Sequence, residues 1–187
     1  RKENARTLDN KINIELPDLK LENAEFQTSI SESEYNQLGK DNVIFKIRTN
    51  PKSKMGDIKE ISSGGELCRI ALAIKVTAEK ANSSTMVFDE VDSGIGGAVS
   101  SAVGERLKKL GEKRQVLVVT HSPQVASQGS NHFLVRKKVS QGNTNIEVIK
   151  IEGENKINEI ARMLSGKHIT PEAILAAKKL MESNLQT

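Results

Sequence analysis

The chain opens on apolar residues spaced three and four positions apart, a pattern that predicts an amphipathic helix. These residues are Ala5, Leu8, Ile12 and Leu16. Proline cannot continue helical hydrogen bonding, so we expect the helix to stop near Pro17. The same spacing is typical of a coiled coil, and we predict that residues 1–17 are the end of such a helix.

Two segments with partial alternation and β-branched residues come next. They run from Ala24 to Ile30 and from Val43 to Arg48. The stretch between them, from Ser31 to Asn42, is polar and contains glycine, which favours a connection over a strand. We predict two antiparallel strands at the edge of the domain.

Helical and strand patterns alternate through the middle of the chain. A helix is predicted from about Gly65 to Lys80, because several apolar residues there share one face. They are Leu67, Ile70, Ala71, Ile74 and Ala78. The following segments are a strand from Thr85 to Asp89, a helix from Gly97 to Leu110 and a strand from Gln115 to Thr120. The first strand is continuously apolar, so we expect both of its faces to be covered. This order predicts parallel strands with helical crossovers.

The last third of the chain predicts a short helix, a hairpin and two longer helices. The short helix lies near Pro123 to Ser127, and the hairpin strands span about His132 to Lys138 and Asn145 to Ile151. The longer helices run from about Lys156 to Leu164 and from Pro171 to Met181. We therefore predict an α/β fold for residues 18–187, with a mainly parallel sheet, flanking helices and antiparallel edge strands.

Composition narrows the class of protein. Of 187 residues 36% are hydrophobic, which is lean for a self-sufficient core. With no Trp and one Tyr the chain offers few platforms for stacking bases, whereas a net charge of +4 is compatible with phosphate contacts. The single Cys68 excludes an internal disulfide and fits a reducing cytoplasm.

Neither membrane nor export signals are evident in the sequence. No run of about 18 apolar residues occurs, so we expect no membrane partner. The chain starts at Arg1 without an initiator Met or the apolar region of a signal peptide. We expect it to begin inside a longer protein.

A run of serines and glycines lies at the start of the helix predicted from about Gly65 to Lys80. Its residues are Ser62, Ser63, Gly64, Gly65 and Glu66. Backbone N–H groups beside glycine can approach an anion, hydroxyls can donate to it, and a helix N-terminus carries about half a positive charge. The run therefore suits a phosphate, although a plain helix cap formed by Ser62 or Ser63 explains the same residues.

Adjacent carboxylates end the apolar strand. Asp89 and Glu90 stand at its carboxyl end, where open α/β sheets bind ligands. One carboxylate can hold a magnesium-bound water, and the next can orient or deprotonate an attacking water. The simpler alternative is that acidic residues commonly begin loops after strands.

A glycine-rich loop and a histidine complete the candidate chemistry. The glycines of residues 91–97 indicate unusual backbone angles or close approach of another chain. His121 follows the next strand at the same sheet edge, so it could reach a terminal phosphate near Glu90. A structural histidine is the common alternative. We assign structural roles to His132 and His168, which lack this context.

The sequence contains no G-x-x-x-x-G-K-[ST] phosphate loop. The Lys and the Ser or Thr that hold the β- and γ-phosphates and magnesium are therefore missing from it. The chain carries half of a nucleotide site.

Three runs resemble the C-terminal head segment of the RecN family, SMC-like ABC-type proteins of bacterial DNA double-strand-break repair. They span Ile61 to Lys75, Val87 to Gly97 and Val118 to Ala126, and the resemblance extends to Asn158 to Gly166. The most specific part is Asp-Glu-Val-Asp-x-Gly-Ile-Gly-Gly. The chain departs from the usual ABC signature by Ser62 in place of Leu.

This resemblance implies the C-terminal lobe of a P-loop ATPase head that uses ATP and Mg²⁺. Asp89 would hold magnesium through water, Glu90 would be the general base, and His121 would sense the γ-phosphate. Ser63, Gly64, Gly65 and, in the D-loop, Asp92 would serve the ATP of the opposite head. The implied partners are the N-terminal lobe, a second head and DNA without sequence preference, in the nucleoid of the cytoplasm.

Two other functions share these elements. A nucleotide-binding subunit of an ABC transporter has the same core motifs, but the predicted coiled coil and Glu66 in the signature favour the SMC-like class. A DNA-end scaffold without hydrolysis is the second alternative. Basic groups such as Lys108-Lys109 could touch DNA, although a solvated face is the more common explanation of such groups.

Overall fold

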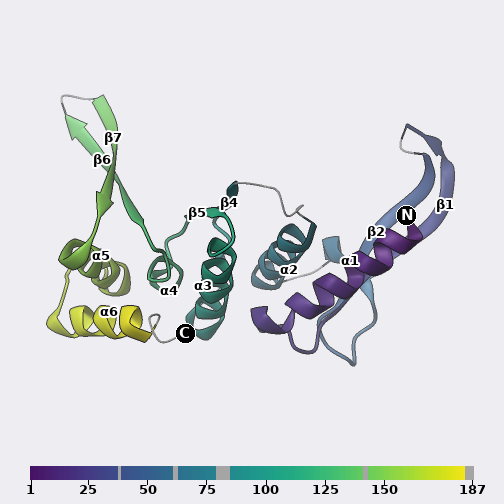
Figure 1. The fold of residues 1–187 in the computed structure, drawn as a ribbon, viewed down its shortest axis with the longest axis horizontal. Helices are drawn as coiled ribbons and strands as arrows, with labels where there is room; N and C mark the ends of the chain where they lie inside the picture. Colours follow the sequence, from purple (N-terminus) through teal and green to yellow (C-terminus); the bar gives the residue numbers. More distant parts are fainter. Residues whose placement is uncertain (38, 61–62, 79–84, 141–142, 184–187) are drawn as a thin grey trace.

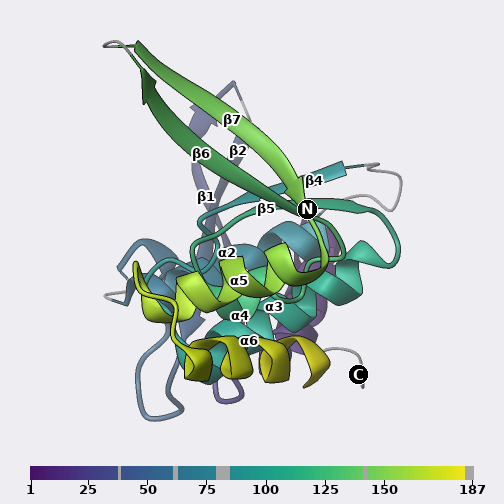
Figure 2. The same ribbon diagram turned by 90° about the vertical axis from the view of Figure 1, so that its left-hand side faces the viewer.

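The structure is a computed structural model that describes residues 1–37, 39–60, 63–78, 85–140 and 143–183. Figure 1 shows an elongated arrangement in which two long hairpins flank a small parallel sheet and its helices. Both hairpins project from the same side of the helices (Figure 2). The signature run predicted to begin at Ser62 lies partly outside the described residues, since Ser62 itself is not among them.

The N-terminal helix and the first hairpin form one end of the molecule. Helix α1 spans Lys2–Glu15, and a 3-10 turn follows at Pro17–Leu19, as expected from the proline. Strands β1 (Glu25–Asn36) and β2 (Gly39–Arg48) pair antiparallel, and the short β3 (Gly56–Asp57) adds to β2. The coiled-coil role of residues 1–17 stays a prediction.

The predicted connection from Ser31 to Asn42 is wrong, because the hairpin continues through it. Ser31 pairs with Asn42, and Glu32 pairs with Asp41. The two strands are joined by backbone hydrogen bonds, and both faces of this two-stranded ribbon meet solvent. Such strands need no apolar side chains, so the polar sequence did not indicate a strand.

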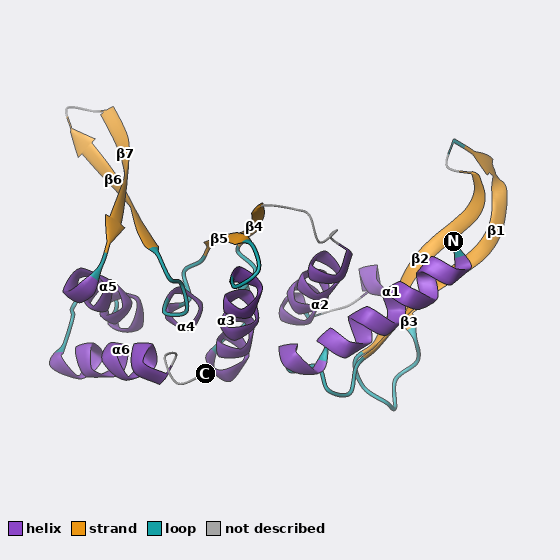
Figure 3. Ribbon diagram, in the orientation of Figure 1, coloured by secondary structure: helices purple, strands orange, loops and turns teal. Residues whose placement is uncertain are grey.

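A parallel pair of strands lies at the centre. Strands β4 (Thr85–Asp89) and β5 (Gln115–Val119) pair in register from one end to the other. They are connected by α3 (Gly97–Gly111), which lies beneath them in Figure 3. The predicted crossover is therefore confirmed, and within the described residues the parallel strands are these two, beside longer antiparallel hairpins.

The second face of this pair is open, contrary to the prediction that both faces are covered. Met86 and Phe88 are buried, whereas Val87, Leu117 and Val119 are 52%, 47% and 58% exposed. The continuously apolar sequence of β4 remains explained only if another element covers that face.

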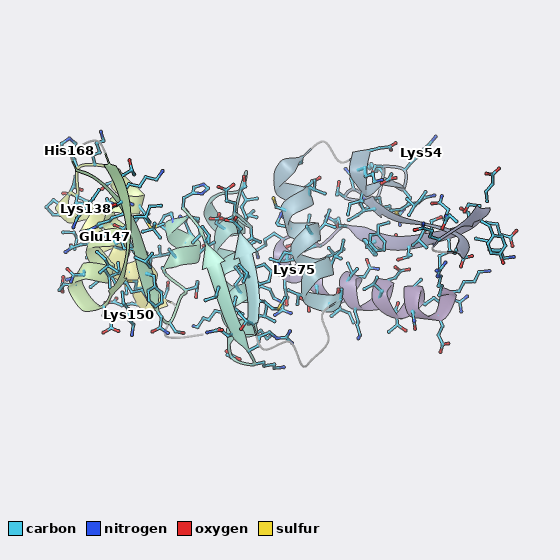
Figure 4. The ribbon with its side chains drawn as sticks, turned by 90° about the horizontal axis from the view of Figure 1, so that it is seen from above. Lys54, Lys75, Lys138, Glu147, Lys150 and His168 are labelled. Carbon is cyan, nitrogen blue, oxygen red and sulfur yellow. The ribbon has the colours of Figure 1, made fainter. Side chains whose placement is uncertain are left out.

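The signature helix α2 (Gly64–Ala78) buries a face that only partly matches the predicted one. Leu67 and Ala71, expected on the buried face, are exposed, and the buried residues include Ile70, Leu72 and Ala73. Lys75 extends from α2 (Figure 4). Its ammonium lies 4.6 Å from the centroid of the Phe88 ring on β4. This cation–π contact helps to hold α2 against β4, and the pattern of apolar residues in the sequence does not predict it.

The remaining elements form the other end. They are α4 (Pro123–Ala126), the hairpin of β6 (His132–Ser140) and β7 (Asn143–Ile151), and helices α5 (Gly153–Ser165) and α6 (Pro171–Ser183). Lys138 and Glu147 form a salt bridge of 2.6 Å across the hairpin (Figure 4). These elements match the predicted order, with ends shifted by a few residues.

Two apolar cores stabilise the part of the chain that the structure describes. The larger core joins α1, α2, α3 and β4 and includes Leu16, Ile70, Val103 and Phe88. The smaller core lies between α5 and α6 and includes Ile160, Ala161 and Ala177. The N-terminal helix is thus part of the same core as the central strands.

Replacing Arg106 with Gln is expected to lower the free energy of unfolding of the chain by about 2 kcal/mol. Its guanidinium donates to both carboxylate oxygens of Glu15, at 2.5 and 2.7 Å, and this bond raises the pKa of Arg106. The pair ties α3 to α1. Urea denaturation can measure the loss, with Lys109→Gln as the control on the same helix. Equal stability of the two variants would show that the Arg106–Glu15 ion pair does not stabilise the packing of α3 against α1.

Candidate functional site

The parallel register brings the two predicted motifs together at one edge. Asp89 and Val119 are register partners at the ends of β4 and β5. The backbone N–H of Glu90 donates to the carbonyl of Val119 at 3.1 Å, so pairing continues just past the strand. Asp89, Glu90 and His121 therefore lie along the same edge of the sheet, as the motif order predicts.

Glu90 has a left-handed backbone, with φ of +50°. Such a conformation costs a residue with a side chain about 1–3 kcal/mol, and residues held in it cluster at functional sites. The carbonyl of Glu90 accepts from Ser93 at 3.0 Å, closing a tight turn directly after the strand. The carboxylates of Asp89 and Glu90 are exposed and form no ion pair with another described residue.

Asp92 lies deeper than its neighbours and contacts the loop that holds His121. The Asp92 side chain is 1% exposed. Its Oδ2 accepts from the hydroxyl of Thr120 and, at 3.1 Å, from the backbone N–H of Ser122. His121, between these two donors, is exposed. The sequence does not predict this contact.

The start of α2 is capped by its own serine. Ser63 Oγ accepts from the N–H of Glu66 at 3.4 Å, so the helix-cap interpretation of this residue is realised. A Cβ added at Gly64 would meet nothing within 4 Å, whereas one at Gly65 would lie 2.8 Å from the carbonyl oxygen of Gly94. Gly64 faces open space, and Gly65 packs closely against Gly94 and Ile95 of the glycine-rich loop.

The predicted close approach at the glycine loop comes from the same chain. Gly94 has φ of +72° and lies against the first turn of α2. Gly97, at the start of α3, also has a positive φ of +54°. The glycines thus serve both unusual backbone angles and close packing of two motifs that are far apart in sequence.

Arg69 is a site residue that sequence analysis missed. This buried side chain donates from Nε to the carbonyl of Gly65 at 3.1 Å, and from Nη1 to the carbonyls of Leu19 and Lys20 at 2.9 and 2.8 Å. It ties the signature turn to the segment after α1. A lone arginine in an otherwise apolar helix face was the available signal.

Sequence comparison relates the chain to DNA-repair proteins. No family model matches it. It is 41% identical over 180 residues to the DNA repair protein RecN of Vibrio cholerae, covering 95% of this chain and 32% of that protein. It is 47% identical over 145 residues to RecN of Xylella fastidiosa, covering 77% of this chain and 26% of that protein. The chain is therefore homologous to one segment of RecN. It spans about a third of the length of these RecN proteins.

Solved structures with the same fold are SMC heads. One comes from work on ATP-driven dimerization and DNA-stimulated activation of SMC ATPases, with a TM-score of 0.63 and 14% identity, covering 89% of this chain and 96% of that chain. The Smc head of Pyrococcus yayanosii has a TM-score of 0.63 and 16% identity, covering 82% of this chain and 28% of that chain. The fold class expected from the resemblance to RecN is confirmed. No described helix is long and apolar enough to cross a membrane.

Proposed function

We propose that the chain is the C-terminal lobe of the ATPase head of a RecN-type protein, which acts in DNA-break repair. The observation that supports this best is the placement of Asp89, Glu90 and His121 along one sheet edge. Identity of 41% to a protein named DNA repair protein RecN supports the repair role. ATP binding and hydrolysis between two heads is the activity we assign to the complete protein.

The exposed carboxylate of Asp89 fits a magnesium ion held through water. No cluster of three or more His, Cys, Asp or Glu capable of holding a metal occurs among the described residues. Mg²⁺ usually keeps several waters and binds one or two carboxylates together with substrate phosphates. Asp89, exposed and free of ion pairs within the described part of the chain, suits that mode. The ion would neutralise phosphate charge during hydrolysis.

Glu90 is the residue we assign as general base. It lies in the tight turn directly after β4, and its exposed carboxylate is accessible to the water it would deprotonate. His121, exposed on the neighbouring loop, would hydrogen-bond the γ-phosphate. We propose that this chain alone is inactive, because it has no phosphate loop to position the nucleotide near Glu90.

The start of α2 is proposed to bind the ATP of an opposite head. Exposed Ser63 and Gly64 stand at the positive end of a 15-residue helix, with open space at Gly64. Gly65 and Asp92 would shape this surface from within, because both are buried. ATP would thus join two heads, and loss of its γ-phosphate would weaken the pairing.

An N-terminal head lobe is the partner we propose for the open face of β4 and β5. Val87, Leu117 and Val119 expose an apolar surface there. The hairpin of β6 and β7 adds Phe133, Val135, Ile146 and Val148, which share one face and are more than half exposed. Exposed apolar patches of this kind mark interaction surfaces.

Replacing Leu117 with Lys is expected to weaken association with the N-terminal lobe about tenfold, because a charge would be buried in an apolar interface. The two lobes can be coexpressed and their affinity measured by calorimetry. Leu175→Lys on α6 is the matched control, since Leu175 is 56% exposed but lies away from the sheet. Equal affinities of the two variants would indicate that the N-terminal lobe binds another surface of the chain.

DNA and a second head complete the proposed assembly. The SMC ATPases with this fold are described as dimerizing with ATP and as activated by DNA. We propose both properties for the complete protein here, with DNA bound without sequence preference and the protein located at the nucleoid. The function is tested by mixing this chain with its N-terminal lobe and measuring ATP hydrolysis with and without DNA. Absence of activity under every reconstitution would overturn the proposed function.

A further inference from the structure

We propose that Asp92 is a positioning residue that fixes the backbone on both sides of His121. This inference rests on the proposed function, in which His121 senses the γ-phosphate. It assigns Asp92 a role within its own head, toward the nucleotide that the same head holds.

The carboxylate holds the residue before His121 and the residue after it. Oδ2 of Asp92 accepts from the hydroxyl of Thr120 and from the N–H of Ser122, the latter at 3.1 Å. The Ser122 N–H also lies 2.9 Å from the Thr120 hydroxyl oxygen. The three groups close a small network around the backbone of His121, so the loop cannot turn at that residue without breaking a bond to a charged group.

Burial makes this network stronger than a surface one. Asp92 is 1% exposed, and Ser122 is buried as well. Hydrogen bonds to a carboxylate are roughly twice as strong as neutral ones, and a water-free surrounding strengthens them further. The His121 side chain remains exposed, so the backbone is held while the imidazole stays available to a ligand.

Asp92 is itself held by the strand and loop on either side of it. Its carbonyl accepts from the N–H of Ile95 at 3.4 Å, and Glu90 is paired with Val119 two residues before. Gly94 and Ile95 pack against Gly65. The carboxylate therefore projects from a fixed backbone, which a positioning residue requires.

The experiment uses the complete protein and steady-state ATP hydrolysis. We expect Asp92→Ala to lower kcat about tenfold with little change in KM for ATP, because a misplaced His121 affects the transition state. Asp92→Asn should give an intermediate kcat, since its amide oxygen can accept from both donors but lacks the charge of the carboxylate. In a His121→Ala background, Asp92→Ala should cause no further loss, because its effect acts through His121.

A second pair of variants covers the case in which Asp92→Ala fails to fold. Thr120→Ser keeps the hydroxyl donor, and Thr120→Val removes it at nearly constant volume. We expect Thr120→Val, and not Thr120→Ser, to reproduce the lowered kcat. Normal kcat in Thr120→Val, or losses that multiply with His121→Ala, would overturn the positioning role.

The outcomes separate this inference from the proposed function. An active wild-type protein that is slowed by His121→Ala, but not by the Asp92 or Thr120 changes, would overturn the positioning role alone. A wild-type protein without ATP hydrolysis would overturn the proposed function and this inference with it.

Discussion

Glu90→Gln in the complete protein is expected to slow ATP turnover about 10²–10⁴-fold, the usual contribution of a positioned general base. Glutamine keeps the shape of the side chain but cannot accept the proton of the attacking water. ATP binding and head pairing should persist, because they depend on phosphate contacts and not on this proton transfer. Single-turnover hydrolysis, together with sedimentation in the presence of ATP, measures both properties.

The matched control is Glu112→Gln, which changes an exposed glutamate at the end of α3 without touching the sheet edge. Its turnover should equal that of the wild type. Normal turnover in Glu90→Gln would remove Glu90 from the role of base. Loss of ATP binding in the same variant would instead indicate a structural role for this strained turn.

Two neighbouring glycines should respond to alanine in opposite ways. Gly65→Ala is expected to lower the free energy of unfolding by about 1–3 kcal/mol, since its Cβ would lie 2.7 Å from Ile95 and 2.8 Å from the carbonyl oxygen of Gly94. Gly64→Ala should leave stability unchanged, because nothing lies within 4 Å of its Cβ. Urea denaturation of the chain can compare the two variants.

The same pair tests the proposed contact with a second head. In the complete protein, Gly64→Ala should reduce ATP-dependent pairing about tenfold or more, because the added methyl would enter the space proposed for the partner's ATP. Sedimentation with a slowly hydrolysed ATP analogue measures this. Unchanged pairing in Gly64→Ala would count against the signature surface, whereas equal stability of the two variants would contradict the packing of Gly65.

Elements with a strong local signal were predicted well from sequence. Strand β4 has the predicted bounds of Thr85 and Asp89, because a short apolar run ends there in two charged residues. Helix α3 begins at the predicted Gly97. The order of motifs also placed Asp89, Glu90 and His121 at one edge, since parallel strands end on the same side.

The missed features depend on residues that are far apart in the chain. Arg69 bonds Leu19, 50 positions away, and Asp92 bonds Ser122, 30 positions away. Local periodicity contains no information about such contacts. The continuation of the hairpin beyond Ile30 was not predicted for another reason. A two-stranded ribbon with both faces in solvent has no hydrophobic pattern from which strands could be predicted.

Arg69 also has a mechanical consequence. Its guanidinium donates hydrogen bonds to the backbone carbonyls of Leu19, Lys20 and Gly65. These bonds link the segment just after α1 to the first turn of α2. In the proposed head dimer, a coiled-coil arm attached to α1 would therefore be coupled to the surface proposed for the second head, and pairing at that surface would bias the angle of the arm.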